Sequence, residues 1–345
     1  MKIAFFVYPS AFQSPGGGEI LLLKTKEVLE SKGISVKLFN QWDDSLKEFD
    51  ILHVFGSVKE CLGLMQTAKA LGVKIVLSPV FWSTLQRALH EYGGIYKKSK
   101  MALQHIVKVI CPVMPSARRK MHLLADILVP NSNEEAKQIS RLFQIDRKKM
   151  RIVYLGVDER FAHAEKNEFV NKYGLEDFIL SVGRIEPRKN QLNLIKAVKG
   201  LDKKLVLIGD PVSGYEEYYK KCKEAAGDNV VFIGHIDHNS NFLSSAYAAC
   251  SVFALQGWFE TPGLAALEAG LAGARLAVTQ GGSTREYFKD YVEYLDPANP
   301  QSIREAIDKA LERPKNIVLK EYIMENFLWH HVAEENIKVY KEILR

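Results

Sequence analysis

Two carboxylates, Glu260 and Glu268, lie eight residues apart in the stretch WFETPGLAALEAG. A carboxylate accepts hydrogen bonds from neighbouring hydroxyls, so it can hold the vicinal diol of a ribose or a hexose. Two glutamates at random positions would be interpreted as solvated helix charges. The Pro-Gly pair between these two, and the small residues Gly270 and Gly273 after them, favour a motif that meets a ligand.

The residues between the two glutamates predict the start of a helix. Thr261 is a suitable N-cap, and Pro262 is tolerated in the first turn, where its missing N–H would have no intrahelical partner. The N–H groups of Gly263 and Leu264 would then be free, and together with the helix dipole they favour a bound anion. One motif thus offers acceptors for hydroxyls and donors for phosphate, which is what a nucleotide sugar requires.

Two cations occur in a second stretch, GRIEPRKN, which begins at Gly183. Arg184 follows an apolar strand and Lys189 precedes a helical pattern, so their side chains can converge on one point although they share no helix face. Fixed cations at that point would neutralise the charge of a departing diphosphate. Arg188, between them, is predicted to be a surface charge.

A third, glycine-rich stretch lies near the N-terminus. The sequence predicts a strand over Lys2–Val7, a loop from Pro9 to Gly18 and then a helix, an order that lets a backbone approach phosphate. Gly17 and Gly18 would make that approach, unless the loop is merely flexible. The glycines do not fit the dinucleotide fingerprint G-x-G-x-x-G, and no acid follows the second strand, which disfavours a dehydrogenase.

These stretches resemble a known family. The segment from Glu260, followed by a strand and the pair Gly281-Gly282, resembles the E-x7-E signature of retaining nucleotide-sugar glycosyltransferases with the GT-B fold, glycosyltransferase family 4 in particular. GRIEPRKN resembles the family's diphosphate motif G-R-x-x-x-x-K-[GN], with Asn190 in place of the more common glycine. The resemblance covers nearly the whole chain and is strongest between residues 180 and 290.

Apolar strands alternate with helical patterns along the chain, which predicts α/β, doubly wound parallel sheets. The resemblance implies the GT-B architecture, in which two Rossmann-like domains face each other across a cleft. We expect an acceptor domain at 1–160, a donor domain at 161–327, and a C-terminal helix at 328–345 that returns to the first domain. A strand from Arg151 is expected to lead through Gly-Val-Asp158 out of the first domain.

The resemblance also implies the activity and its residues. It implies a hexosyltransferase with a nucleotide-diphosphate sugar as donor and a glycan or lipid-linked hydroxyl as acceptor, as in polysaccharide biosynthesis. The catalytic residues would be Arg184, Lys189 and Glu260. The donor would contact these three residues and Gly17, Gly18, Gly183, Gly234, His235, Pro262, Gly263, Leu264 and Glu268. No D-x-D triplet occurs, so no metal is expected. The resemblance implies no other cofactor, since the nucleotide-diphosphate sugar is a co-substrate.

The chain departs from the family in its first domain. Many members have a histidine at the end of the strand that corresponds to residues 73–78, where this chain continues Ser-Pro-Val-Phe-Trp82. His53, at the end of the preceding strand, or Trp82 could take its place. A lone histidine is more often structural, so His53 is not included among the predicted catalytic residues.

The net charge of +6 is unevenly distributed. Eight Lys or Arg residues and a single acid, Glu91, lie between Arg87 and Lys120. This basic segment, 87–120, also contains regularly spaced apolar residues. It fits a peripheral contact with anionic lipid or a buried helix with solvated ends, and both interpretations stay open. Nucleic acid is not expected as a partner, because aromatic residues do not interleave with the bases.

The four cysteines, Cys61, Cys111, Cys222 and Cys250, form no C-x-x-C pair, which suits free thiols in a reducing compartment. The sequence contains no apolar run of membrane-helix length, and its first residues do not resemble a signal peptide. A cytoplasmic protein is expected, at the cytoplasmic face of a membrane if the basic segment binds lipid.

Two alternative functions stay open. A nucleotide-sugar 2-epimerase shares the GT-B fold and would convert its sugar without an acceptor. A non-catalytic nucleotide-sugar-binding subunit would bind the donor tightly, with neither transfer nor hydrolysis.

Overall fold

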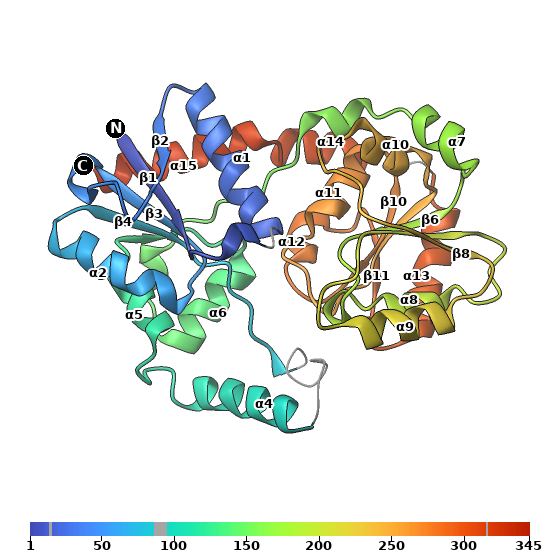
Figure 1. Ribbon diagram of the computed structural model, residues 1–345, viewed down its shortest axis with the longest axis horizontal. Helices are drawn as coiled ribbons and strands as arrows, with labels where there is room; N and C mark the ends of the chain where they lie inside the picture. Colours follow the sequence, from blue (N-terminus) through green and yellow to red (C-terminus); the bar gives the residue numbers. More distant parts are fainter. Residues whose placement is uncertain (14–15, 86–94, 315–316) are drawn as a thin grey trace. The chain divides into compact units, whose positions relative to one another are not determined.

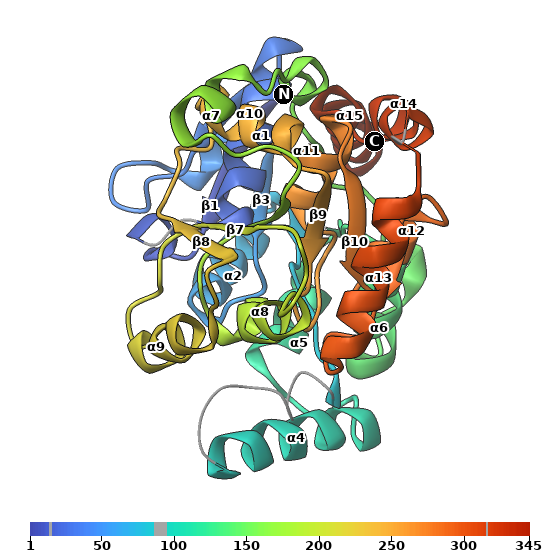
Figure 2. The ribbon, with the colours of Figure 1, turned by 90° about the vertical axis from the view of Figure 1, so that its right-hand side faces the viewer.

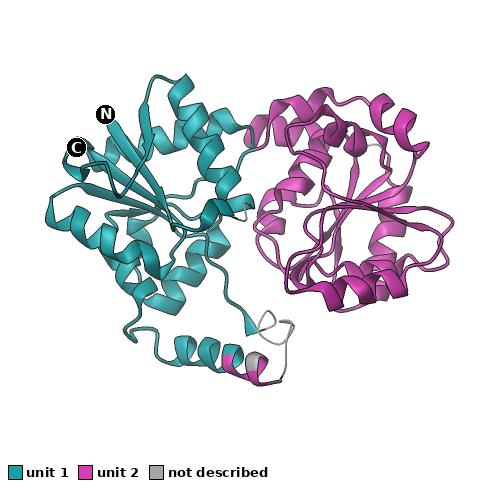
Figure 3. Ribbon diagram, viewed as in Figure 1, with its two compact units in different colours: residues 1–85, 101–156, 327–345 teal, residues 86–100, 157–326 magenta. Residues whose placement is uncertain are grey.

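A computed structural model of the chain describes residues 1–13, 16–85, 95–314 and 317–345. The chain divides into two compact units (Figure 3). Among the described residues, unit 1 consists of 1–85, 101–156 and 327–345, and unit 2 consists of 157–326 together with 95–100. Of the basic segment 87–120, residues 87–94 lie outside the described residues.

Unit 1 contains a parallel sheet in the order β2-β1-β3-β4-β5. Its strands are β1 (Lys2–Val7), β2 (Ser35–Leu38), β3 (Ile51–Phe55), β4 (Lys74–Ser78) and β5 (Ile127–Leu128). Its helices are α1 (Gly17–Ser31), α2 (Leu62–Ala70), α4 (Ile95–Ile110, whose first residues belong to unit 2), α5 (Ala117–Leu124), α6 (Asn133–Phe143) and α15 (Trp329–Ile343). Helices α1 and α15 lie side by side, and α2 packs against α5 (Figure 1).

Unit 2 contains a parallel sheet in the order β11-β10-β9-β6-β7-β8. Its strands are β6 (Ile179–Val182), β7 (Leu205–Ile208), β8 (Val230–Ile233), β9 (Val252–Leu255), β10 (Arg275–Thr279) and β11 (Glu293–Leu295). Helices α8 (Gln191–Ala197), α9 (Glu216–Ala225) and α13 (Pro300–Glu312) cover one face (Figure 2). The other face carries α7 (Asn167–Tyr173), α10 (Asn241–Ala249), α11 (Leu264–Leu271) and α14 (Ile317–Asn326), and α12 (Thr284–Phe288) follows β10.

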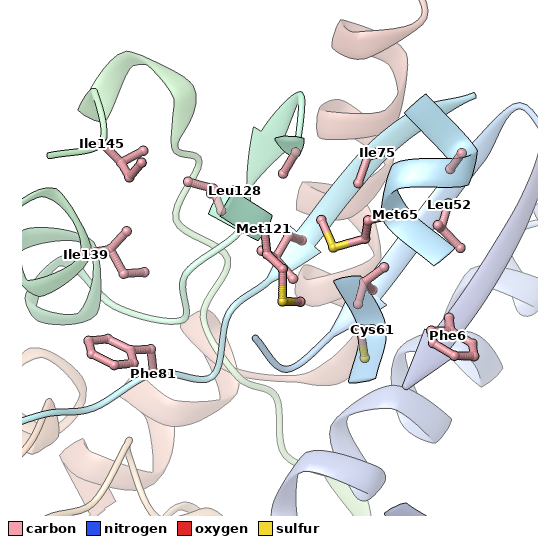
Figure 4. Packing of buried hydrophobic residues seen from close by; sticks show 14 of the residues in the cluster. Phe6, Leu52, Cys61, Met65, Ile75, Phe81, Met121, Leu128, Ile139 and Ile145 are labelled. Atoms are coloured by element: carbon pink, nitrogen blue, oxygen red, sulfur yellow. The ribbon is translucent and has the colours of Figure 1, made fainter. Parts of the chain in front are cut away.

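The central strands of both sheets are buried on both faces, which explains why they are nearly continuous runs of apolar residues. In unit 1, side chains from the sheet meet those of α2, α5 and α6 in a single cluster (Figure 4). The cluster includes Leu52, Met65, Ile75, Met121 and Ile139, none of which is exposed. The predicted α/β class with two doubly wound parallel sheets is therefore confirmed.

The first helix begins earlier than the sequence predicted. Gly17 and Gly18 form the first turn of α1 and are not part of a loop. The N–H of Gly16 donates to Oε2 of Glu19 at 2.8 Å, and the hydroxyl of Tyr8 donates to Oε1 of Glu19 at 3.1 Å. Glu19 thus satisfies a backbone donor at the helix start, as in a capping box, which stabilises this early start.

One further prediction about local structure was wrong. The expected strand from Arg151 does not form: Arg151 N–H and Val153 N–H donate to the carbonyls of Leu128 and Pro130, but only an isolated bridge between Leu128 and Met150 joins this segment to β5. The described part of the basic segment forms two helices, α4 and α5, because prolines lie in the connection 111–116, and proline removes a helical donor.

His53 has a structural role within unit 1. It is 1% exposed, and its Nδ1 and Nε2 atoms lie 2.7 Å from the hydroxyl of Tyr340 and 2.8 Å from that of Ser78. Tyr340 belongs to the last helix, α15, so this pair links the C-terminal helix to the centre of the sheet of unit 1. At Gly156, a Cβ atom would lie 2.7 Å from the ring of Trp329, so the start of α15 requires a glycine there.

The bond between His53 and Tyr340 predicts a stability effect. Tyr340→Phe should lower the free energy of unfolding by about 1–3 kcal/mol, because it leaves a buried ring nitrogen without its partner. Tyr96→Phe, at a side chain that is 81% exposed, is the control and should change it by less than about 0.5 kcal/mol. Denaturant unfolding measures both, and equal effects would contradict the structural role of this bond.

The buried ring also predicts a dependence on pH. Burial lowers the pKa of His53 from 6.5 to about 3, so the unfolded chain takes up a proton on His53 below pH 6.5 while the folded chain does not. The stability that neutral His53 contributes is therefore complete above pH 6.5 and decreases as the pH falls. The difference in unfolding free energy between wild type and His53→Gln should shrink from pH 7.5 to pH 5, and a constant difference would contradict this.

Candidate functional site

The candidate site lies where two adjacent strands of unit 2 end. Strands β6 and β9 pair in parallel in the middle of the sheet. In open parallel sheets, ligands bind outside the carboxyl ends of the strands. The stretch 183–190 follows β6, and the stretch 256–263 follows β9. The sheet thus brings together two stretches that are far apart in the sequence.

Hydrogen bonds join the two stretches. The backbone N–H of Trp258 donates to the carbonyl of Arg188 at 3.1 Å, and its indole Nε1–H donates to the carbonyl of Pro187 at 3.1 Å. The side-chain amide of Gln256 donates to the carbonyl of Lys189 at 2.8 Å, and Gln256 is 2% exposed. These bonds hold the backbones of 183–190 and 256–263 against each other.

Asn190 shows why the family's motif ends in glycine or asparagine. Its φ is +58°, in the left-handed region, which glycine adopts freely and asparagine tolerates best among the other residues. The Nδ2 group of Asn190 donates to the carbonyl of Pro297 at 2.7 Å and to that of Gln256 at 3.2 Å. The asparagine therefore makes the turn before α8 and also attaches it to two neighbouring segments.

Lys189 and Glu260 form an ion pair within the site. The Nζ atom of Lys189 lies 2.6 Å from Oε1 of Glu260, whose carboxylate is buried. Burial lowers the pKa of Lys189, and the charge of Glu260 opposes this effect. The side chain of Lys189 passes Gly183, where a Cβ atom would lie 3.6 Å from its Cε. The pair holds a cation next to a carboxylate that can accept hydrogen bonds from sugar hydroxyls.

Two arginines share a second carboxylate, that of the buried Glu186. An Nη atom of Arg188 lies 3.1 Å from Oε1 of Glu186, and an Nη atom of Arg184 lies 3.7 Å from it. Arg188 also lies 3.8 Å from Glu260. The prediction that Arg188 is merely a surface charge was therefore wrong. No pattern in the sequence indicates the contact between Arg188 and Glu260, because it depends on the pairing of β6 with β9.

Glu268 is held by two residues that the sequence did not indicate. The hydroxyl of Tyr247 donates to Oε2 of Glu268 at 2.7 Å, and Nε2 of His238 lies 2.7 Å from Oε1. Glu268 is 5% exposed, and Tyr247 is fully buried, so the carboxylate has a fixed orientation. Each carboxylate oxygen can accept a further hydrogen bond, which leaves capacity for a diol. Tyr247 lies in α10 and His238 between β8 and α10, too far from Glu268 in sequence for a spacing rule.

The helix between the two glutamates begins one residue after Gly263. The carbonyl of Gly263 accepts from Ala266 N–H at 2.9 Å, so Gly263 is the N-cap of α11 and the predicted cap Thr261 was wrong. Gly263 has a φ of +93°, and a Cβ atom there would lie 2.7 Å from a Leu255 methyl group. The peptide bond between Thr261 and Pro262 is cis. Leu264 is the first helical residue.

The other residues predicted to bind the nucleotide-sugar donor lie outside these two stretches. Gly234 and His235 follow β8, and the N–H of His235 donates to Asp210 at 3.0 Å. His238, in the same connection, contacts Glu268, so this loop adjoins the E-x7-E helix. Gly17 and Gly18 belong to unit 1, and their contact with the donor stays a prediction.

The close approach of Gly282 to Glu260 predicts a stability effect. A Cβ atom at Gly282 would lie 1.9 Å from the carbonyl oxygen of Glu260, and the φ of Gly282 is +105°. Gly282→Ala should lower the free energy of unfolding by about 2–4 kcal/mol. Gly273→Ala is the matched control, because its φ of +87° carries the same strain but no atom lies within 4 Å. It should cost about 1–2 kcal/mol in the same denaturation experiment; equal losses would contradict the clash.

Comparison with known proteins identifies similar sequences. Residues 163–325 match the model of the family described as glycosyl transferases group 1. The chain is 28% identical to an uncharacterized glycosyltransferase of Methanocaldococcus jannaschii over 59% of this chain and 57% of that protein. It is 26% identical to the D-inositol 3-phosphate glycosyltransferase of Stackebrandtia nassauensis over 64% of this chain and 55% of that protein. The chain spans about half the length of these curated relatives.

Solved structures agree on the fold. The Anabaena protein HepE, in complex with UDP and glucose, superposes with a TM-score of 0.74 and 16% identity over 99% of both chains. The GT-B fold predicted from the sequence is thereby confirmed, and the glycosyltransferase prediction is confirmed at the level of family and fold. Residues 163–325 therefore form a domain of the glycosyl transferases group 1 family, in a chain that has the GT-B fold.

Proposed function

We propose that the chain is a retaining glycosyltransferase. It moves a hexose from a nucleoside diphosphate sugar to a hydroxyl of a glycan, glycolipid or other acceptor, without a metal. The observation that carries the proposal is the Lys189–Glu260 pair at the carboxyl ends of β6 and β9, with Arg184 in the same stretch. The relative from Stackebrandtia is named for transfer to D-inositol 3-phosphate, and HepE binds UDP and glucose, which supports a nucleotide-sugar donor and a hydroxyl acceptor.

The residues have separate roles in the proposed reaction. The cations Lys189 and Arg184 face the diphosphate and neutralise the charge that develops on it as its bond to the anomeric carbon breaks. Glu260 accepts hydrogen bonds from hydroxyls of the transferred sugar. Glu268, oriented by Tyr247, accepts from the ribose diol.

In the proposed step, the acceptor oxygen attacks the anomeric carbon from the face that the diphosphate leaves. The bond between that carbon and the diphosphate oxygen breaks, and a glycosidic bond to the acceptor oxygen forms. The proton of the acceptor passes to the departing diphosphate. Because attack and departure occur on the same face, the anomeric configuration is retained. Cations in a site shielded from water stabilise this separation of charge more than they would in bulk solvent.

We further propose a cytoplasmic location. All four cysteines are free thiols, and Cys111 is exposed, which suits a reducing compartment. Among the described helices, none has the length and apolar character needed to cross a bilayer.

The donor site predicts selective nucleotide binding. The melting temperature should rise with one of UDP, GDP or ADP, or with its sugar, and only weakly with the others, because a ligand that binds the folded state stabilises it. Glu268→Gln should remove most of this shift. Lys199→Gln, at an exposed position of the same unit, is the control and should keep it. The absence of a shift with every nucleotide would contradict the proposal.

The catalytic roles predict a loss of transfer. With the donor thus identified and an acceptor found by screening, Lys189→Ala should lower kcat by roughly 100-fold or more, since it removes a cation that acts in the transition state. Transfer should continue in excess EDTA, and NMR of the product should show the donor's anomeric configuration. Donor binding without transfer to any acceptor would favour a non-catalytic subunit, and conversion of the sugar without an acceptor would favour an epimerase.

A further inference from the structure

Helix α4 exposes an apolar stripe. Tyr96, Leu103 and Ile110 recur at intervals of seven residues, so they lie on one face, and they are 81%, 61% and 72% exposed. Ile106 lies at the edge of the same face and is 42% exposed. In a surface helix of a globular protein, the apolar face normally packs inward.

The opposite face of α4 is the more polar one. His105 lies on the far side of the helix from Leu103, and its Nδ1 atom lies 3.1 Å from the hydroxyl of Ser83. His105 is only half-buried, and so is Lys108, which lies on the same side. The amphipathic helix therefore presents its apolar side to solvent and its polar side to the chain.

The exposed apolar surface continues beyond the helix. In the connection between α4 and α5, Val113 and Met114 are 60% and 56% exposed. Figures 1 and 2 show this connection leading directly from the end of α4 into α5. We call Tyr96, Leu103, Ile106, Ile110, Val113 and Met114 the α4 surface.

The charge around the α4 surface has one sign. Between Ile95 and Ala125 the sequence contains no Asp or Glu. In this range, Lys100 and Lys120 are exposed, whereas Lys98 and Lys108 are half-buried and Lys108 lies on the side of His105. Arg118 differs from them, because its guanidinium donates to Ser57, so it also serves the packing of unit 1. Lysine side chains are long enough to keep their charge in water beside a buried apolar stripe.

We propose that the α4 surface docks the protein on an anionic lipid bilayer, with α4 parallel to the membrane plane. An exposed apolar stripe flanked by lysines is the pattern of interfacial helices, which bury apolar side chains at the headgroup boundary and attract anionic lipid. The helix has 16 residues and carries several lysines, so it lies on the bilayer and does not cross it.

Charge decides between a bilayer and a second copy of the chain. Two α4 surfaces facing each other would bring two sets of lysines together with no acid in either segment, which opposes self-association. An anionic bilayer offers the opposite charge and an apolar interior at the same time. The proposal does not depend on the transfer reaction, because vesicle binding requires neither donor nor acceptor.

The exposed thiol of Cys111 allows a direct test on the unmutated chain. Cys111 immediately follows Ile110, and Cys61, Cys222 and Cys250 are buried, so an environment-sensitive dye should label Cys111 selectively. With phosphatidylcholine vesicles that contain 30% phosphatidylglycerol, the dye emission should shift to the blue, and the protein should co-sediment. Pure phosphatidylcholine vesicles should retain roughly tenfold less protein, and 0.5 M salt should weaken binding to the anionic ones.

Paired variants separate the apolar and electrostatic contributions. Leu103→Ser with Ile110→Ser, and separately Lys100→Glu with Lys120→Glu, should each lower vesicle affinity by roughly tenfold or more. The matched controls are Ile317→Ser with Val318→Ser, which are 66% and 56% exposed in α14, and Lys220→Glu with Lys341→Glu. The controls should bind like wild type, and circular dichroism should show unchanged folding for all four.

Three outcomes would overturn the proposal. They are equal binding to zwitterionic and anionic vesicles, vesicle binding unchanged by both α4 variants, and no vesicle binding at all. In the last case, concentration-dependent dimerisation that Leu103→Ser with Ile110→Ser abolishes would identify a second copy of the chain as the occupant.

Discussion

The candidate site depends on the pairing of Lys189 with Glu260 in unit 2. A buried carboxylate without a partner is costly, and removing one member of a buried ion pair typically costs about 3–5 kcal/mol. The two residues come from different loops, so the pair persists only while the loops keep their spacing. This explains why the backbones of 183–190 and 256–263 are joined by the indole and amide groups of Trp258 and Gln256.

The need to keep the two loops at this spacing also explains the glycines around the Lys189–Glu260 pair. A Cβ atom at Gly257 would lie 2.7 Å from the Glu260 carboxylate, and one at Gly282 would meet its backbone carbonyl. Glu260 N–H donates to the carbonyl of Gly281, and Ser283 N–H donates to that of Glu260. The loops after β9 and β10 thus enclose Glu260 from both sides. The carboxylate is fixed before any ligand arrives, and preorganised charge of this kind is effective in catalysis.

Unit 1 also contains a buried ionisable side chain held by hydrogen bonds, but this one stabilises the fold. His53, in the middle of β3, bonds with the hydroxyls of Tyr340 and Ser78, which are themselves buried. A buried ring with both nitrogens hydrogen-bonded in this way stabilises the fold and cannot contact a substrate. The predicted strand-end position made His53 a candidate for the site, but the structure places His53 in the middle of β3, where it attaches α15. The α4 surface is a second distinctive feature of the chain, since it offers lipid an apolar face that the core does not use.

Much of the architecture followed from local patterns in the sequence. Apolar runs located the strands, and the E-x7-E and G-R-x-x-x-x-K stretches located Glu260, Glu268, Arg184 and Lys189. This worked because strands buried on both faces require continuous apolar residues, and because Gly263 and Asn190 mark turns that few residue types can make. These constraints act over a few residues, so a single sequence reveals them.

Tertiary structure alone decided which of these residues meet. The Lys189–Glu260 pair and the approach of Arg188 arise because β6 lies next to β9, although β7 and β8 separate them in the chain. The contacts of Glu268 with Tyr247 and His238 likewise join a helix to a neighbouring helix and loop. The sequence determined the elements and the charged groups, because those depend on local periodicity and turn chemistry. Only the folded sheet determined their partners, because strand order brings together residues whose separation in sequence follows no fixed spacing.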